Sequence, residues 1–298
     1  MCGIVGLFIK DKSLEPQLGT MLTDMLITMS DRGPDSAGIA IYGDGSDTHS
    51  KLTVQSNNPA KDFKTLADDL SKAINAKVTL RQKDTHAVVE VAKAHIDEAR
   101  NALHDLRPNV RVMSMGDRVE IYKEVGLPKD VAARFDLRKM GGSHGVGHTR
   151  MATESAVTTM GAHPFSTGAD QCLVHNGSLS NHNSLRRKLR RDGIHIETEN
   201  DTEVGAAYLT WKMQQGSTLG EALESSLNDL DGFFTFVVGT KDGFGVVRDP
   251  IACKPAVMAE TDQYVAFGSE YRALVNLPDI ENARVWEPEP ATVYFWNH

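Results

Sequence analysis

The sequence predicts an α+β protein in which antiparallel sheets are packed with helices. Short apolar runs of strand character occur at residues 3–9 and 37–42, and they recur at intervals after residue 143. Only two helical stretches, near residues 183–191 and 202–227, interrupt the later strands. Parallel strands need a crossover connection, usually a helix, between successive strands, so this spacing favours antiparallel sheets over a βαβ array.

The composition is that of a folded protein with an acidic surface. The chain has 298 residues, of which 40% are hydrophobic and 24% are charged, which is enough to build a core. Its 40 acidic residues outnumber its 32 basic ones and give a formal net charge of -8. We therefore expect no nucleic-acid partner, and the lack of a long apolar run predicts no membrane span. Three cysteines are too few for a disulfide framework and favour a cytoplasmic location.

The first 45 residues predict a strand, a helix and a second strand. After the apolar run at 3–9, apolar side chains recur at helical spacing between residues 15 and 30. These side chains are Leu18, Met21, Leu22, Met25, Leu26 and Met29. The polar turn DRGPDS leads into the strand at 37–42, which Gly-Asp-Gly at 43–45 ends.

Residues 46–142 differ in composition from the rest of the chain. They predict a small α/β module inserted into a single domain that spans 1–298. Charge is denser there, and glycine is sparse until the end of the segment. We expect a compact βαββα unit with a hairpin across Gly116 and Asp117, a dipeptide suited to a tight turn, and a last short helix that Pro128 opens. Its other predicted elements are a helix at 63–74, a strand at 86–91 and a helix at 96–106.

Cys2 is the most informative single residue. Removal of the initiator methionine, which is expected before so small a residue, would leave Cys2 with a thiol and a free α-amino group. An α-amine titrates near ~7.7 to 8.0 and a thiol near ~8.5, so one residue could supply both the base and the nucleophile. Taken alone, however, Cys2 is better explained as a small apolar residue that starts a strand.

Motifs elsewhere in the chain change that interpretation. They are MCGIVG at the start, RGPDSAG at 32–38, GHTRMAT at 147–153, AHPF at 162–165, VHNGSLSNH at 174–182 and NDTEV at 200–204. In this order they resemble the class II glutamine amidotransferases over residues 1–45 and about 143–275. The resemblance implies the N-terminal-nucleophile hydrolase fold, a four-layer αββα sandwich with two antiparallel sheets between helix layers.

The resemblance also implies which residues act on the amide. By similarity, Cys2 attacks the side-chain amide carbonyl of glutamine, its own amine moves the proton, and water hydrolyses the resulting thioester. The Asn176 side chain and the Gly177 backbone N–H match the oxyanion donors of the family. Without the other motifs, the Asn-Gly pair would more simply be a β-turn.

Two further matches concern the head group of the substrate. Arg150 matches the arginine that holds the α-carboxylate, a task that suits the paired donors of a guanidinium. Asp201 matches the acid that receives the α-ammonium, although a cap for a helix beginning at Glu203 would also explain it. By similarity, Thr153 and His163 line the pocket.

Arg32 and Asp35, in the RGPDS loop, are expected to support the nucleophile from behind.

We expect no metal site. The two histidines of GGSHGVGHTR are four residues apart, but the glycine-rich flanks argue against a shared helix face, and no carboxylate nearby completes a triad.

The resemblance also limits which substrates and partners we expect. Met151 and Glu154 stand where sugar-phosphate aminotransferases have Trp and His, which argues against hexosamine synthesis and leaves glutamine or an N-substituted relative as substrate.

Because the chain ends soon after these motifs, we expect the amine acceptor to bind on another polypeptide. Among stand-alone glutaminase-type subunits, the chain most resembles the small one of N-methylglutamate synthase and of split glutamate-synthase-like enzymes. That likeness implies no cofactor in this chain, with flavin and an iron-sulfur cluster in a partner synthase subunit.

Two other classes of function stay open from the sequence. The chain could be a non-catalytic regulatory or scaffold subunit of the same complex. It could also be an N-terminal-nucleophile hydrolase of another amide, although Arg150 and Asp201 together suit a free amino acid head group.

Overall fold

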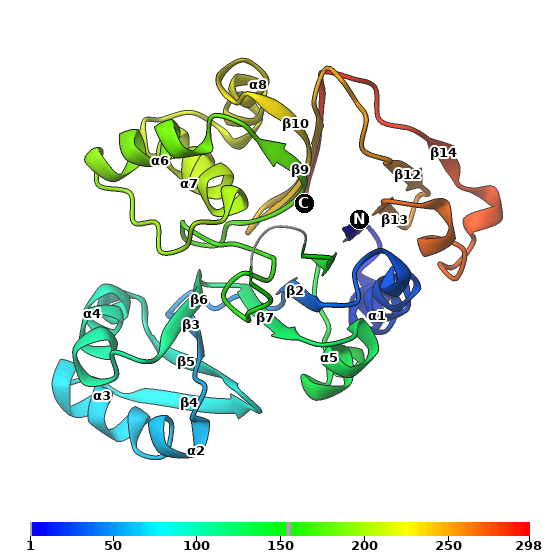
Figure 1. Cartoon of the computed structure of the whole chain (residues 1–298). Coiled ribbons are helices and arrows are strands. Elements are labelled where there is room, and N and C mark those ends of the chain that lie inside the picture. Colours follow the sequence, from blue (N-terminus) through cyan, green and yellow to red (C-terminus); the bar gives the residue numbers. More distant parts are fainter. Residues whose placement is uncertain (1, 153–155) are drawn as a thin grey trace.

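A computed structural model describes residues 2–152 and 156–298, and two antiparallel sheets form the centre of the protein (Figure 1). The first sheet has seven strands. In spatial order they are β14 (Arg284–Trp286), β12 (Val257–Glu260), β13 (Tyr264–Gly268), β1 (Gly3–Ile9), β8 (His144–Arg150), β2 (Ser36–Tyr42) and β7 (Val119–Val125). The second sheet has four, in the order β15 (Thr292–Asn297), β11 (Gly243–Arg248), β10 (Gly232–Thr240) and β9 (Cys172–Leu179).

Helices cover the outer face of each sheet. The first sheet carries α1 (Leu18–Thr28) and α5 (Pro128–Arg134), and the second carries α6 (His182–Arg191), α7 (Asp201–Gln214) and α8 (Leu219–Asp229). The helical stretch expected at 202–227 is thus two helices, because Thr218 and Glu221 form a capping box that starts the second. Short 3₁₀ helices are η1 (Lys12–Gln17), η2 (Ser30–Arg32), η3 (Lys93–His95), η4 (Leu137–Lys139), η5 (Tyr271–Ala273) and η6 (Ile280–Asn282).

Alternation along β1 shows how the layers are built. Val5, Leu7 and Ile9 pack with the buried side chains of α1, whereas Ile4 and Phe8 pack between the two sheets. The sheets approach closely at Gly6, where a Cβ would lie 2.7 Å from the ring of Phe244. The α+β class and the sandwich with two central antiparallel sheets are therefore confirmed.

A third, smaller sheet lies beside the sandwich, at the lower left of Figure 1. Its strands, in spatial order, are β4 (Val78–Lys83), β5 (His86–Ala92), β3 (His49–Gln55) and β6 (Arg111–Gly116). It packs with α2 (Pro59–Asp62), α3 (Leu66–Ile74) and α4 (Ile96–Leu106) around an apolar core of its own. None of the described helices is both long and apolar enough to cross a bilayer.

The hairpin expected across Gly116 and Asp117 does not form. β6 pairs with β3 in the small sheet, whereas β7 pairs with β2 in the first sheet. At this turn the buried Asp170 carboxylate accepts the backbone N–H groups of Asp117, Arg118 and Val119 at 2.8–3.0 Å. The separate sheet therefore spans only 49–116, and β7 and α5, which the sequence placed in the module, belong to the sandwich.

Candidate active site

Cys2 lies just before β1, where three distant segments meet. Its backbone carbonyl accepts hydrogen bonds from Arg32 Nε at 2.9 Å and from Asn176 Nδ2 at 3.3 Å. Its Sγ lies 3.9 Å from the carbonyl oxygen of Met151. The structure thus brings residues of the RGPDS loop, of GHTRMAT and of VHNGSLSNH around the cysteine, and it holds the Cys2 backbone from two sides.

The Arg32 guanidinium is buried, and a buried charge needs partners. Besides its bond to the Cys2 carbonyl, it forms an ion pair with Glu270 at 2.6 Å. Glu270 also pairs with Arg272 at 2.6 Å. The hydrogen bond from Arg32 is the main cause that lowers the pKa of Glu270, so this carboxylate stays charged. Sequence reasoning named Arg32 but missed Glu270, although it lies in the family-like segment YVAFGSEYRAL.

Asn176 and Gly177 lie in β9, opposite Thr235 and Phe234 of β10. The Asn176 side chain is buried, and its bond to the Cys2 carbonyl leaves the second N–H of its amide for another acceptor. Gly177 has φ +147°, and a Cβ there would lie 2.0 Å from the carbonyl oxygen of Phe233. No side chain fits at this position, which explains glycine next to Asn176.

Asp35 fixes the backbone that follows β8. Its carboxylate accepts the N–H of Ala152 at 2.8 Å, and its own N–H donates to the Arg150 carbonyl at 3.1 Å. Gly33 lets the two segments touch, since a Cβ there would lie 2.3 Å from the carbonyl carbon of Thr149. Arg150 is buried at the end of β8, and its Nη1 donates to the Ala156 carbonyl at 3.3 Å. Thr153 and Glu154 lie outside the described residues.

Asp201 is the first residue of α7, but it does not cap that helix. The cap is Asn200, whose side chain accepts the N–H of Thr202 at 2.8 Å. The Asp201 carboxylate instead accepts the N–H of Leu179 at 3.0 Å and lies 3.8 Å from His175 Nδ1. This arrangement ties the start of α7 to β9, the strand that carries Asn176.

Three buried histidines link these motifs from behind. The ring of His163 stacks on His148 with centroids 4.0 Å apart, and the Thr202 hydroxyl lies between His163 Nε2 at 3.2 Å and His175 Nδ1 at 3.1 Å. His148 Nε2 in turn donates to the His175 carbonyl at 3.2 Å. His163, expected to line the pocket, is therefore packed within this cluster. Sequence reasoning quoted the motifs that contain His148 and His175 but gave neither residue a role.

Burial decides the charge of these imidazoles. It lowers the pKa of His148 to about 3 and that of His163 well below its usual value. Burial also lowers the pKa of His175, against the opposing pull of Asp201. The three imidazoles are therefore neutral near pH 7. They hold the segments around Cys2 in place and add no charge beside it. His144, the other histidine of GGSHGVGHTR, bonds the Thr240 carbonyl at 2.8 Å, away from this cluster.

Comparisons with known proteins agree with this arrangement. The family model of the glutamine amidotransferase domain matches residues 148–276. The chain is 72% identical to the glutamine amidotransferase-like protein GlxB of Rhizobium meliloti, over 100% of this chain and 99% of that protein. It is 31% identical to the amidophosphoribosyltransferase of Methanocaldococcus jannaschii, over 59% of this chain and 38% of that one.

A solved structure, the glutamine phosphoribosylpyrophosphate amidotransferase of B. subtilis, shares the fold with a TM-score of 0.63. The two sequences are 20% identical, and the match covers 99% of this chain and 47% of that one. Sheets, motifs and relatives thus define an enzyme with the fold of the N-terminal-nucleophile hydrolases. The chain belongs to the class II glutamine amidotransferase family, as its motifs predict.

Proposed function

We propose that the chain is the glutaminase subunit of an amidotransferase and that Cys2 is its nucleophile. The observation that carries this proposal is the position of Cys2, whose carbonyl is held by Arg32 and Asn176 at the meeting point of the family motifs. The names of the relatives support glutamine as the substrate.

The proposed reaction begins once removal of Met1 has freed the α-amine of Cys2. That amine takes the thiol proton, and the sulfur bonds to the amide carbon of glutamine. The negative oxygen of the tetrahedral intermediate accepts hydrogen bonds from the Asn176 side chain and the Gly177 N–H. Collapse of the intermediate breaks the C–N bond, and the amine returns its proton to the departing ammonia. Water then attacks the thioester carbon while the amine takes a proton from it; the C–S bond breaks, the amine returns the proton to the sulfur, and glutamate leaves.

We assign the head group of the substrate to Arg150 and Asp201. The guanidinium at the end of β8 would hold the α-carboxylate, and the carboxylate at the start of α7 would receive the α-ammonium. Asp35 supports the first of these, because it fixes the backbone at Arg150 and Ala152. The contacts of Asp201 with Leu179 and His175 support the second.

We further propose that the amine passes to a partner synthase of the N-methylglutamate synthase type, with flavin and an iron-sulfur cluster in that partner. Among the described residues, the part outside the sandwich is only a small sheet with three helices, which supports an acceptor site on another chain. In this version γ-glutamylmethylamide is a substrate and the enzyme releases methylamine by the same thioester route.

Intact-mass analysis after a glutamine-analogue electrophile tests the nucleophile. We expect one adduct on a chain that lacks Met1, and no adduct on Cys2→Ala. The exposed Cys253 supplies the matched control, because Cys253→Ala should still take up one adduct. A retained Met1, or a label that survives in Cys2→Ala and disappears in Cys253→Ala, would overturn the proposal.

Amine release from two amides tests the substrate. The purified chain is given glutamine and γ-glutamylmethylamide separately, and ammonia and methylamine are measured. Methylamine release that depends on Cys2 supports the methylamide version. Ammonia from glutamine with no methylamine from the alkylamide would reject that version and keep the glutaminase.

A further inference from the structure

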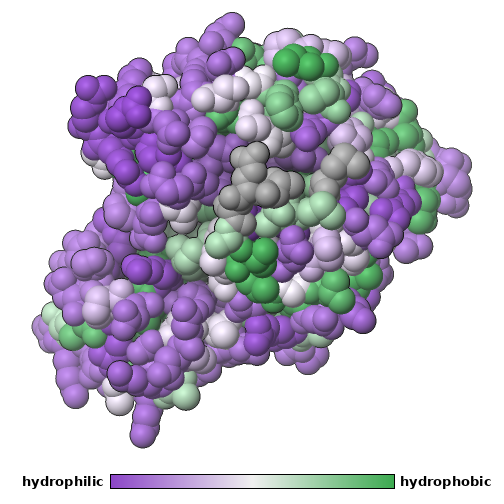
Figure 2. Space-filling view, viewed as in Figure 1, coloured by the Kyte–Doolittle hydropathy of each residue, from purple (hydrophilic) through white to green (hydrophobic). Residues whose placement is uncertain are grey.

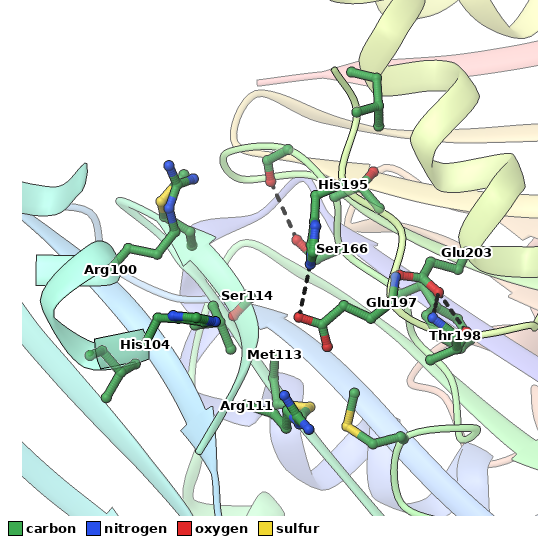
Figure 3. A pocket seen from close by; sticks show the side chains of 18 of the residues that line it. Arg100, His104, Arg111, Met113, Ser114, Ser166, His195, Glu197, Thr198 and Glu203 are labelled. Atoms are coloured by element: carbon green, nitrogen blue, oxygen red, sulfur yellow. Dashed lines mark hydrogen bonds and ion pairs between the residues drawn. The ribbon is translucent and has the colours of Figure 1, made fainter. Parts of the chain in front are cut away.

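A cavity lies between the small sheet and the sandwich, and Cys2 does not line it. Its volume is about 490 Å³, within the range of pockets that bind small metabolites. One wall comes from α4 and β6, and the other from residues 165–168, 193–198 and the start of α7. Figure 2 shows an indentation of the molecular surface at the left, between the small sheet and the sandwich. Figure 3 shows the cavity from close by. None of the described residues assigned above to catalysis or substrate binding lines it.

The two walls carry opposite charges. Arg100 on α4 and Arg111 on β6 lie on the small-sheet side, and Glu197 extends into the cavity from the sandwich side (Figure 3). Arg111 has no ion pair among the described residues, and Arg100 pairs there only with Asp97, at 3.1 Å on the same exposed helix surface. Glu197 accepts from His195 Nε2 at 3.2 Å, which leaves its other oxygen open to a ligand. The cavity therefore suits a ligand with both a negative and a positive group.

Apolar side chains supply part of the lining between these charges, beside serine and threonine side chains. The apolar ones include Met113 of β6, which packs in one core cluster with Met160, and Phe165 of the sandwich. Methionine side chains are flexible and adapt to ligands of differing shape. From the charges and this lining together we propose that the cavity binds a free α-amino acid with an apolar side chain. Its α-carboxylate lies against Arg111, its α-ammonium lies against Glu197, and its side chain lies over Met113 and Phe165.

The floor of the cavity connects it to the active site. Lys123 Nζ donates to the carbonyls of Ala162 at 2.8 Å and Pro164 at 3.2 Å, and it lies 4.2 Å from the centre of the Phe165 ring. Lys123 thus holds the segment that carries His163, whose Nε2 contacts Thr202 beside Asp201.

The same segment meets the cap of α7 as well, because the Asn200 amide donates to the Gly161 carbonyl at 3.4 Å. A ligand against Phe165 orders this segment and, through it, the start of α7. We therefore expect the amino acid to act as an effector that improves glutamine binding. This effect rests on the proposed glutaminase activity, whereas the binding itself does not.

Calorimetric titration of the full chain with L-norleucine tests the binding. Hexanoate lacks the ammonium and pentylamine lacks the carboxylate, so each should bind about tenfold more weakly. Arg111→Gln and Glu197→Gln should each weaken norleucine binding by about tenfold. Arg111 is exposed and Glu197 is partly exposed, so both variants keep the core intact. Arg187→Gln, an exposed position on α6, is the matched control and should bind as the unaltered chain does.

Two results would overturn the assignment. Norleucine that produces no heat of binding would reject the site. Binding that survives both cavity variants and disappears in Arg150→Gln would place the amino acid in the active site instead. Glutamine kinetics test the coupling: saturating norleucine should lower KM by about fivefold, and an unchanged KM would reject the effector role. Because calorimetry needs no turnover, a chain without glutaminase activity would still report on the cavity.

Discussion

The sandwich around Cys2 and the small sheet bury different sets of polar side chains. Behind Cys2, the sandwich buries charged Arg32 and the imidazoles of His148, His163 and His175, and each is placed by specific hydrogen bonds. The small sheet has an apolar core of its own, and the polar side chains that it buries are those of Ser50, Thr53, Gln55, Ser56, Asp62, His86 and Ser114. Burying polar groups costs free energy, and natural proteins accept this cost mainly where a site needs it. Connected guanidinium and imidazole groups thus distinguish the region around Cys2, whereas the small sheet has a separate apolar core.

Replacing Cys2, the proposed nucleophile, should give the largest effect on this comparison. Cys2→Ala should lower the rate of ammonia release from glutamine by at least about 10⁴-fold, because the thioester cannot form. The side chain is only partly buried, so the thermal midpoint should stay within a few degrees. Ammonia release and a melting curve on the same sample check both points. Activity retained in Cys2→Ala would point to the regulatory or scaffold alternative.

The next largest effect should come from Asn176, the proposed oxyanion donor. Asn176→Ala should lower kcat by about 10² to 10³-fold and leave KM less affected, since its bond forms mainly in the transition state. It also removes the bond to the Cys2 carbonyl. Steady-state kinetics separate the two parameters. A rise in KM with unchanged kcat would show that Asn176 acts on binding and not on the oxyanion.

A substitution in the core of the small sheet should instead lower stability and leave turnover unchanged. Leu70 is fully buried in the core of that sheet, and Leu70→Ala should lower the free energy of unfolding by about 3 kcal/mol. Turnover per folded molecule should not change, because no catalytic side chain contacts this core. Urea unfolding and active-site-normalised kinetics check the two statements. A fall in kcat that matches the loss of stability would show that the two regions are coupled more tightly than their separate cores suggest.

The smallest effect should appear in the pH dependence of stability. His86 lies where the small sheet meets the sandwich, against Tyr122 and Phe135, and burial lowers its pKa to about 3. In the unfolded chain it takes up a proton near pH ~6.5, so its contribution is present above that pH and is lost as the pH falls toward 3.

His86→Phe should therefore reduce the fall in unfolding free energy between pH ~6.5 and 5, by at most about 1.4 kcal/mol per pH unit. Urea unfolding at several pH values measures the slope. Replacement of the exposed His104 by Phe is the control and should leave the slope unchanged. An unchanged slope in His86→Phe would show that His86 stays neutral in the unfolded chain or protonates in the native one.

Local pattern was enough to predict much of the fold. The apolar run at 3–9 is β1, and the helical spacing from Leu18 onward is α1, because alternation and the 3.6-residue period are properties of neighbouring residues. The motifs likewise located Cys2, Arg32 and Asn176 before any contact between them was known. The break between α7 and α8 was missed, although Thr218 and Glu221 carry the sequence signature of a capping box.

What the sequence determined by itself was the set of elements, the core-facing side chains and the family motifs, all of which are encoded within short windows. Only the tertiary structure decided which sheet each strand joins and which polar groups meet. β6 and β7 separate because Asp170, more than fifty residues away, accepts the N–H groups at their turn. His148, His163 and His175 gather behind Cys2 for the same reason: long-range hydrogen bonds and burial act between segments whose separation along the chain leaves no periodic signal.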